Sequence, residues 1–394
     1  MKRYKYAVLG AGRQGTACAY DMLMWGDAES VVLADADRAA AERAAKRVNA
    51  LTGGSRASAV ALDVRDTGAV SALLEGVDAF LSAVPYYFNL EITKAAIAGR
   101  ASMCDLGGNT DIVRKQLELS SLAVHAGISI IPDCGQVPGM GTTLMSYAMQ
   151  MLDEPDEVFM WDGGLPQDPK PPFGYLMTFN IAGLTNEYAE PPVYLRQGEI
   201  VAVEPMSELE EIVIPPLGRL EAFTTAGGTS TAPWTHKGKL RTYQNKTLRY
   251  PGHFAQLRAF MDLGLWRLDP IRIGEAAAAT ATAAVVPRDV FHALFEPLAT
   301  RAGEKDVVVI RIIARGKKDG RMAEAQIDLI DYYDETTGFT AMERTTGWDG
   351  AIVAELMARG RTPRGAVPVE IAVPPGEFVA ELRKRGFAIQ ETLR

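Results

Sequence analysis

A lysine, an arginine and a histidine lie within eight residues of one another in the second half of the chain, at Lys246, Arg249 and His253. This run ends at a proline–glycine turn before an expected helix. An arginine can bind a carboxylate through two parallel hydrogen bonds and a lysine adds a point charge, so the cluster suits capture of an acidic group. A histidine titrates near neutrality, which suits proton transfer. A solvated strand with His253 as a helix cap explains the same residues equally well.

Two aspartates and a tyrosine pair are further candidates for chemistry. Asp162 is followed by two glycines and would either face a cleft or form a simple turn. Asp133 stands beside Cys134 in a turn-rich link, where it would hold a water molecule; we expect the cysteine itself to be small and buried. Tyr86 and Tyr87 follow an expected strand that ends at 84, where open α/β sheets bind ligands, and we assign pocket lining to Tyr86.

A glycine-rich turn near the start of the chain has the spacing of a phosphate-binding loop. Gly10, Gly12 and Gly15 separate an apolar run at 6–9 from a helical pattern at 16–25. Gly10 would make the tight turn, Gly12 would let a pyrophosphate approach the backbone, and Gly15 would allow close helix–strand packing. The amide groups at the start of the helix would then hold the phosphates.

The second half of the same fingerprint is present at Asp35. This residue ends the apolar run 31–34 and follows Gly15 by 20 positions. An acidic side chain there hydrogen-bonds the ribose 2′-hydroxyl of NAD and repels the 2′-phosphate of NADP, although Arg38 could weaken that preference. We therefore expect NAD. The other expected cofactor contacts lie in the loop or at strand ends: Arg13, Gln14, Asp63, Val64, Val84 and Pro85.

The elements that must position these residues fall into two patterns. Up to residue 133, strands alternate with helices, which predicts an α/β Rossmann fold with a doubly wound parallel sheet. From 134 to about 338 the pattern changes to strands separated by turns, with two helices and a hairpin through 318–320, which predicts an α+β domain with a mixed or antiparallel sheet. The expected strands of the first part are 58–64, 77–84, 102–106 and 128–132, with helices at 38–50 and 111–126.

Composition excludes several classes of function. The chain has 394 residues and a net charge of −8, which argues against broad binding to nucleic acid or anionic membranes. We find no apolar run long enough to cross a bilayer and no signal peptide before the first strand, so we expect a cytoplasmic protein. Three scattered cysteines are too few for a disulfide framework or a zinc site, and we expect no metal.

The chain resembles the saccharopine dehydrogenase superfamily, and within it the NAD-dependent lysine 6-dehydrogenases. The Lys-Thr-Leu-Arg-Tyr-Pro-Gly-His run is the most specific carrier of the resemblance and is closer to the lysine-oxidising branch than to the saccharopine-splitting one. The resemblance covers nearly the whole chain, and its motifs lie at 10–15, 84–87, 132–135 with 138–139, 162–166, 246–253 and 342–347.

The resemblance implies a domain arrangement and a reaction. Residues from about 339 to 394 would return to the nucleotide domain formed by 1–133, and residues 134–338 would bind the substrate and form a homodimer through their sheet. NAD+ would take a hydride from the carbon that bears the ε-amine of L-lysine, and water would release ammonia to leave allysine, which cyclises.

The reaction sets a requirement for a base and for anchors at the far end of the substrate. Hydride leaves an amine-bearing carbon only after the ammonium has lost a proton, and our candidates for the base are His253, then Asp162, then a water held by Asp133. Arg249 with Lys246 would anchor the α-carboxylate. The remaining candidates for substrate binding are Glu343, as partner of the α-ammonium, and Thr345, which would otherwise cap the helix that follows.

Two other functions stay open at this point. An imine reductase or opine-type dehydrogenase, as in saccharopine or carboxynorspermidine formation, would need a second carboxylate-binding cluster, and the sequence has one obvious cluster. A non-catalytic NAD-binding sensor is the more remote alternative.

Overall fold

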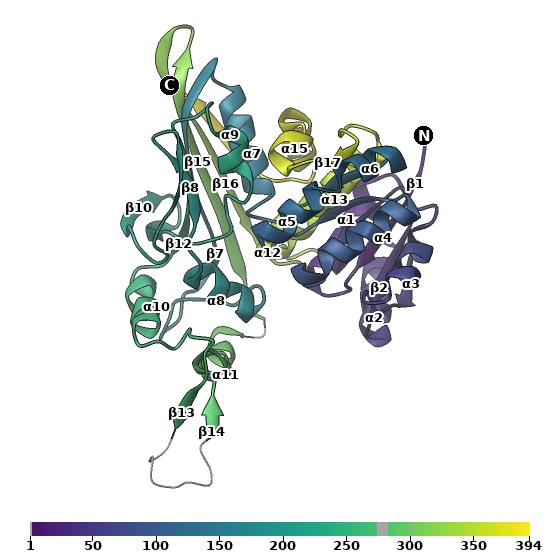
Figure 1. Cartoon of the computed structure of the whole chain (residues 1–394), viewed down its shortest axis with the longest axis horizontal. Helices are drawn as coiled ribbons and strands as arrows, with labels where there is room; N and C mark the ends of the chain where they lie inside the picture. The colour runs from purple at the N-terminus through teal and green to yellow at the C-terminus, as the bar shows by residue number, and fades with distance from the viewer. Residues whose placement is uncertain (1, 274–282, 302) are drawn as a thin grey trace.

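Two domains lie side by side in the computed structural model, which describes residues 2–273, 283–301 and 303–394 (Figure 1). The first domain contains a seven-stranded sheet in the order β17-β6-β5-β4-β1-β2-β3, with every neighbouring pair parallel. Its strands are β1 Tyr4–Leu9, β2 Ala28–Asp35, β3 Ala57–Ala61, β4 Ala79–Ser82, β5 Ser102–Asp105, β6 Ser129–Ile131 and β17 Gly365–Ala366. The strand order reverses between β1 and β4, and ligands bind in the crevice at such a point.

Helices cover both faces of this sheet, so its central strands are buried on both sides and read as near-continuous apolar runs. The expected Rossmann fold is confirmed. The helix expected over 111–126 is divided in two at Leu119, which caps the second part. The helices before the second domain are α1 Arg13–Trp25, α2 Arg38–Thr52, α3 Thr67–Leu74, the short η1 Tyr86–Phe88, α4 Asn89–Gly99, α5 Thr110–Leu117 and α6 Ser120–Ala126.

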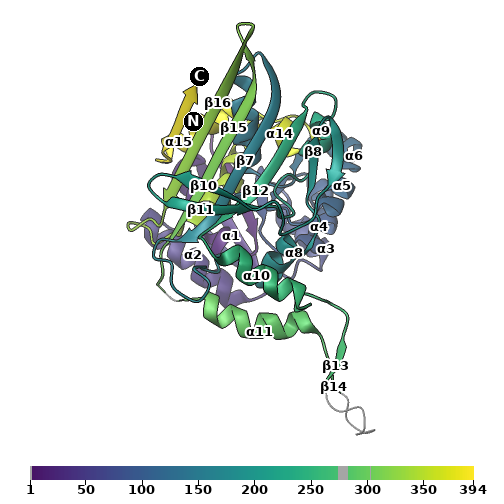
Figure 2. The same cartoon turned by 90° about the vertical axis from the view of Figure 1, so that its left-hand side faces the viewer.

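A long twisted sheet forms the second domain (Figure 2). Its main path is β10-β11-β12-β7-β15-β16-β18, and the β8–β9 hairpin joins it beside β12. β12 pairs with β7 in parallel and the other pairs are antiparallel, so the sheet is mixed. Its strands are β7 Glu154–Pro166, β8 Val193–Arg196, β9 Glu199–Ala202, β10 Glu210–Ile214, β11 Gly218–Phe223, β12 Thr242–Arg249, β15 Asp306–Lys318, β16 Arg321–Tyr332 and β18 Ile389–Leu393.

One face of this sheet packs on a helix that also approaches the first domain. α7, Met140–Gln150, contacts β7, β15 and β16 on one side and the C-terminal helices on the other. The remaining elements of this domain are α8 Ile181–Ala189, α9 Ala232–His236, α10 His253–Asp262, α11 Pro287–Ala299 and a small two-stranded sheet of β13 Ile271–Ile273 with β14 Ala283–Val285.

The C-terminal segment crosses between the domains twice. After the second domain the chain forms α12 Ala341–Glu343, a π-helical turn Arg344–Trp348 and α13 Asp349–Ala358, and α13 packs against β4, β5 and α1. β17, α14 Val369–Ala372 and α15 Pro375–Lys384 continue in the first domain. The prediction that 339–394 lies in that domain is wrong for the last strand, because β18 pairs antiparallel with β16 and extends the second sheet.

A buried ion cluster holds the C-terminal segment against α1. Arg385 donates from Nη2 to Asp21 at 2.8 Å and to Glu355 at 2.7 Å, and all three side chains are fully buried. Losing one partner of such a buried pair would cost about 3–5 kcal/mol, because the other charge would remain without compensation. This cluster therefore fixes the position of α13 and α15 on the nucleotide domain.

No helix within the described ranges is long and apolar enough to cross a lipid bilayer. Cys18, Cys104 and Cys134 are buried free thiols, in agreement with the interpretation of Cys134 as a small buried residue.

Candidate active site

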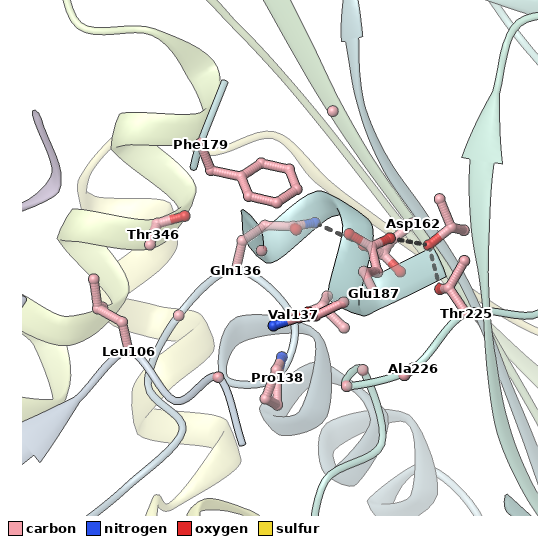
Figure 3. A pocket seen from close by; sticks show the side chains of 18 of the residues that line it. Leu106, Gln136, Val137, Pro138, Asp162, Phe179, Glu187, Thr225, Ala226 and Thr346 are labelled. Carbon is pink, nitrogen blue, oxygen red and sulfur yellow. Dashed lines mark hydrogen bonds between the residues drawn. The ribbon is translucent and has the colours of Figure 1, made fainter. Parts of the chain in front are cut away.

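A cavity of about 340 Å³ lies between the strand ends of the first domain and the sheet of the second (Figure 3). Tyr86, Leu106, Gln136 and Thr346 line it from the side of the nucleotide domain, as does Gln14 at the start of α1. From the second domain come the residues that carry charge or hydrogen-bonding groups: Asp162, Asn186, Glu187, Glu190, Thr225, Asn245, Thr247 and Arg249. The predicted cofactor loop and part of the predicted substrate cluster thus meet at one cavity.

The glycine loop has the shape needed for a dinucleotide. Gly10 has a φ of +95°, and a Cβ there would lie 2.8 Å from the carbonyl oxygen of Ala83. A Cβ on Gly15 would lie 1.9 Å from the carbonyl oxygen of Gly10, whereas one on Gly12 would meet nothing within 4 Å. Gly12 caps α1 without a side-chain bond, and the first turn has no acidic residue, so its amides can receive an anion. These residues fit the diphosphate of a nicotinamide dinucleotide.

Asp35 stands at the end of β2 next to this loop. Its carboxylate accepts hydrogen bonds from the amide of Ala11 at 2.8 Å and from the amide of Asp37 at 2.9 Å. Asp35 therefore braces the glycine loop, in addition to lying where a ribose would bind. Arg38 forms an exposed ion pair with Glu42 along α2.

The other predicted cofactor contacts lie at the start of α1, where Gln14 lines the cavity, and after strands β3 and β4. Asp63 forms an ion pair with Arg65, and that guanidinium lowers the pKa of the carboxyl to about 2. Val84 approaches Gly10, since its Cγ1 would lie 3.1 Å from a Cβ there. Val64 is half-buried after β3, and Pro85 is exposed after β4. Nε of Arg13 donates to Glu343 at 2.8 Å.

Strand β12 divides the predicted substrate cluster between its two faces. Asn245, Thr247 and Arg249 line the cavity, because alternate side chains of a strand point to the same face. Lys246 lies on the opposite face, where its Nζ donates to the carbonyl oxygen of Glu208 at 2.8 Å and pairs with Glu210 at 3.2 Å. Lys246 therefore does not reach the cavity in this structure, and Arg249 is left to bind a carboxylate without it.

The guanidinium of Arg249 is held from several sides. Its Nε donates to the hydroxyl of Tyr188 at 2.7 Å, and its Nη1 donates to the carbonyl oxygen of Leu248 at 2.8 Å. Its Nη2 lies 3.7 Å from Oε1 of Glu187. Because two of its nitrogens are fixed, the third is presented to the cavity in a defined orientation.

His253 lies behind Arg249 and outside the cavity lining. Its Nδ1 is 3.3 Å from the carbonyl oxygen of Phe173 and its Nε2 is 3.1 Å from the hydroxyl of Tyr188. A carbonyl oxygen only accepts, so Nδ1 carries the proton and Nε2 accepts from the tyrosine. Burial lowers the pKa of His253 to about 3, with a further contribution from Arg249. This histidine is neutral and positions Tyr188, so the structure does not support it as first choice for the base.

Asp162 lines the cavity between Arg249 and the nucleotide domain. It accepts a hydrogen bond from Asn245 at 2.6 Å. It accepts a second one from Gln136 at 3.2 Å (Figure 3). Burial raises the pKa of the Asp162 carboxyl to about 6, while those two amides and Arg249 oppose the rise. A carboxyl with this pKa is mostly ionised at neutral pH and can accept a proton.

Asp133 is buried and is not one of the residues that line the cavity. It adopts the left-handed backbone region with a φ of 65°, and the hydroxyl of Ser230 donates to its carboxyl. Burial raises its pKa to about 8, and the neighbouring carboxyls of Asp105 and Glu370 add to the rise. Asp133 therefore joins the two domains through Ser230.

The two predicted contacts near the start of the C-terminal segment are occupied elsewhere. Glu343 is buried, and its carboxylate accepts from Arg13 and from the amide of Thr340 at 2.8 Å in a capping box. The Thr345 hydroxyl donates to the carbonyl oxygen of Ala341 at 2.8 Å, whereas Thr346 reaches the cavity. Glu343 thus serves its own helix and is not available to a substrate ammonium.

Several residues of the cavity were not anticipated. Asn245 and Thr247 could have been found from the alternation in β12, because they flank Lys246 and share the face of Arg249. Glu187 lies on α8, in a region where we expected strands, and no local pattern indicates its role. Gln136 reaches the cavity from the turn-rich link that follows Asp133.

The comparisons with known proteins agree with this arrangement. Residues 6–131 match the saccharopine dehydrogenase NADP binding domain, and residues 135–387 match the saccharopine dehydrogenase C-terminal domain. The chain belongs to the saccharopine dehydrogenase family. The fold of this family member is similar to that of apo saccharopine dehydrogenase (L-Glu forming) from Saccharomyces cerevisiae, with a TM-score of 0.78 at 21% identity over 99% of this chain and 100% of the other.

Two curated relatives are similar in sequence over part of their length. Alpha-aminoadipic semialdehyde synthase of Bos taurus, a mitochondrial protein, is 26% identical over 357 residues, which are 74% of this chain and 38% of the relative. Saccharopine dehydrogenase [NADP(+), L-glutamate-forming] of Saccharomyces cerevisiae is 26% identical over 239 residues, 58% of this chain and 52% of the relative. The family member described here therefore matches about two fifths to one half of each relative.

Proposed function

We propose that this protein oxidatively deaminates the ε-amine of L-lysine, or of a close diamino acid, with NAD+. The observation that carries the proposal is the charge of the cavity. Among the described lining residues, Arg249 is the one side chain with a full positive charge, whereas Asp162, Glu187 and Glu190 are acidic. Lysine has one carboxylate and two amines, which suits one cation and several carboxylates.

Asp162 is our candidate for the base that removes the proton from the substrate ammonium. In water, neutralising a lysine ε-ammonium at pH 7 costs about 4–5 kcal/mol. Burial raises the pKa of Asp162, which reduces this cost. Desolvation of the substrate ammonium in the cavity also lowers the pKa of that ammonium, whereas the negative charge of the carboxylate beside it acts in the opposite direction. Asn245 and Gln136 hold the carboxylate of Asp162 in place while it accepts the proton.

The remaining residues divide between the two ends of the cavity. Arg249 would bind the substrate carboxylate at the end away from the glycine loop, and Tyr86 and Thr346 would bound the end nearest the nucleotide domain. The nicotinamide, when bound, supplies the acceptor for the hydride. Anchoring at the remote end orients the reacting carbon, which is how binding energy becomes rate.

A preference for NAD is part of the proposal. Asp35 carries its charge where a 2′-phosphate would have to lie, and it is held there by the Ala11 amide. The names of the matched domain and of the yeast relative refer to NADP, and a comparison of kcat/KM with NAD and with NADP tests the preference.

A saccharopine-type dehydrogenase is the second candidate, because the relatives found by sequence include enzymes of that name. Saccharopine has three carboxylates, and a site for it would need cations beyond Arg249. The acidic cavity therefore favours the diamino acid.

An assay that measures NADH formation by its absorbance, with a panel of amines and amino acids as substrates, tests the proposal. Lysine-dependent formation of NADH with release of ammonia is expected, and Arg249→Ala should raise the Michaelis constant for lysine far more than that for NAD. Turnover only with saccharopine, or only with an amine plus an oxo acid and reduced cofactor, would contradict lysine oxidation and support the saccharopine-type dehydrogenase. Tight NAD binding with no turnover would instead indicate a sensor.

A further inference from the structure

The far end of the cavity contains an acidic side chain beside Arg249 whose role the sequence did not indicate. Glu187 lies on α8, and its Oε1 is 3.7 Å from Nη2 of Arg249 and accepts a hydrogen bond from the hydroxyl of Thr247 at 3.0 Å. The backbone of the same residue is fixed as well, because its carbonyl oxygen accepts from the amide of Ala226 at 2.8 Å. Glu187 is therefore held from β12 and from the loop after β11.

The two charges of this pair face the same space. Arg249 and Glu187 both line the cavity, with side-chain exposures of 4% and 22%. Tyr188 and the carbonyl oxygen of Leu248 fix the orientation of the guanidinium. Fixed, adjacent and opposite charges in a small cavity are complementary to a ligand that carries both charges on neighbouring atoms.

We infer that Glu187 and Arg249 together form a subsite for the head group of an α-amino acid, in which Arg249 binds the α-carboxylate and Glu187 binds the α-ammonium. The inference rests on the proposed function in one respect, which is that the side chain of the bound substrate extends from this subsite toward Asp162. It assigns to Glu187 the role that the sequence suggested for Glu343. The subsite makes a zwitterionic head group a requirement for tight binding, so simple diamines and ω-amino acids are poor ligands.

The subsite can be tested without turnover. L-Norleucine has the head group and an unreactive tail, hexanoate is the same molecule without the amine, and pentylamine is the same molecule without the carboxylate. Titration calorimetry on the full chain with NADH bound should give an affinity for L-norleucine about ten- to hundredfold above that for either truncated ligand, since each contact to a charged group contributes about 1.5–3 kcal/mol. Equal affinity for norleucine and hexanoate would overturn the role of Glu187.

A matched substitution separates the two charges. Glu187→Gln keeps the size of the side chain and should lower the affinity for L-norleucine about tenfold while leaving that for hexanoate unchanged or higher. An equal loss for both ligands, or no loss for norleucine, would overturn the inference. If the variant does not fold, as judged by its melting temperature and by NADH binding, the comparison of the three ligands on the unaltered protein decides alone. Because no step needs catalysis, norleucine binding without lysine oxidation would preserve the subsite and remove the proposed reaction.

Discussion

The hydroxyl of Tyr188 joins the imidazole of His253 to the guanidinium of Arg249. It donates to Nε2 of the histidine across 3.1 Å and accepts from Nε of the arginine at 2.7 Å. Because Nδ1 of His253 is fixed by the carbonyl oxygen of Phe173, the orientation of Arg249 depends on a chain of hydrogen bonds that begins outside the cavity. A histidine that resembled a proton carrier in the sequence is thus part of the support for a binding group.

Removing the hydroxyl of Tyr188 should therefore affect substrate binding more than the chemical step. We expect Tyr188→Phe to raise the Michaelis constant for lysine by about three- to tenfold, because the Nε–H of Arg249 loses its acceptor, a loss of about 1 kcal/mol or more. The constant for NAD should not change. Tyr243→Phe is the matched control, since the Tyr243 hydroxyl is buried with no partner among the described residues. Steady-state kinetics on both variants test the prediction. A similar rise in the Michaelis constant for lysine in the two variants would contradict it.

The pH dependence of the reaction should report Asp162. As base, this carboxyl must be ionised, so kcat/KM for lysine is expected to rise as the pH increases through about 6. Asp162→Asn should remove this limb and lower kcat by about 10²–10⁴-fold, while NADH binding is unchanged. A rising limb near pH 6 that persists in the variant would assign the base to another group.

The buried carboxyl of Asp133 should make the protein less stable as the pH rises. Its folded-state pKa, about 8, lies above the ordinary value, so its contribution is present at low pH and is lost as the pH rises through about 8. Relative to Asp133→Asn, which keeps a side-chain acceptor for Ser230, the protein should lose stability between about pH 4 and pH 8 at up to ~1.4 kcal/mol per pH unit. Urea unfolding of both proteins across this range measures the difference, and parallel curves would refute it.

The charge of Asp35 should decide between the two cofactors. We expect kcat/KM with NAD to exceed that with NADP by about tenfold or more, equivalent to ~1.4 kcal/mol, and Asp35→Asn to narrow the ratio. Asp37→Asn removes an equal charge two residues away and keeps the cap of α2, so it serves as the control. An unchanged ratio in Asp35→Asn, or the same narrowing in the control, would show that the preference has another source.

Lys246 provides a test of the strand register. Its side chain lies on the face of β12 away from the cavity, so Lys246→Met should leave the Michaelis constant for lysine within about twofold of the original. The melting temperature of the variant shows whether loss of the pair with Glu210 has affected folding. A rise in the Michaelis constant comparable to that of Arg249→Ala would mean that Lys246 does reach the substrate.

The nucleotide domain was predictable because its signals are local. The close contacts at Gly10 and Gly15 are those that the glycine spacing predicts. Asp35 lies at the end of β2, as its position after an apolar run predicts. The alternation of side chains in β12 was also available from the sequence, and applying it would have separated Lys246 from Arg249.

The substrate end of the cavity was less predictable because it depends on tertiary packing. Glu187 reaches the cavity only because α8 packs beside β12, and nothing within its own segment indicates this. The neutral state of His253 follows from its burial between Phe173 and Tyr188, which lie 80 and 65 residues away in the chain. Glu343 was misassigned because a capping box and an ion pair with Arg13 occupy its carboxylate.

The last strand has a consequence for how copies of this protein behave beside one another. β16 presents twelve residues along its outer side, and a long unpaired strand at the rim of a sheet is a template for adding strands from other molecules. β18 is short and covers part of that rim, pairing with Ala325 through Leu329, and its exposed residues are Gln390, Thr392 and Leu393. β18 therefore shortens the stretch of β16 that a strand from another copy of this protein could join.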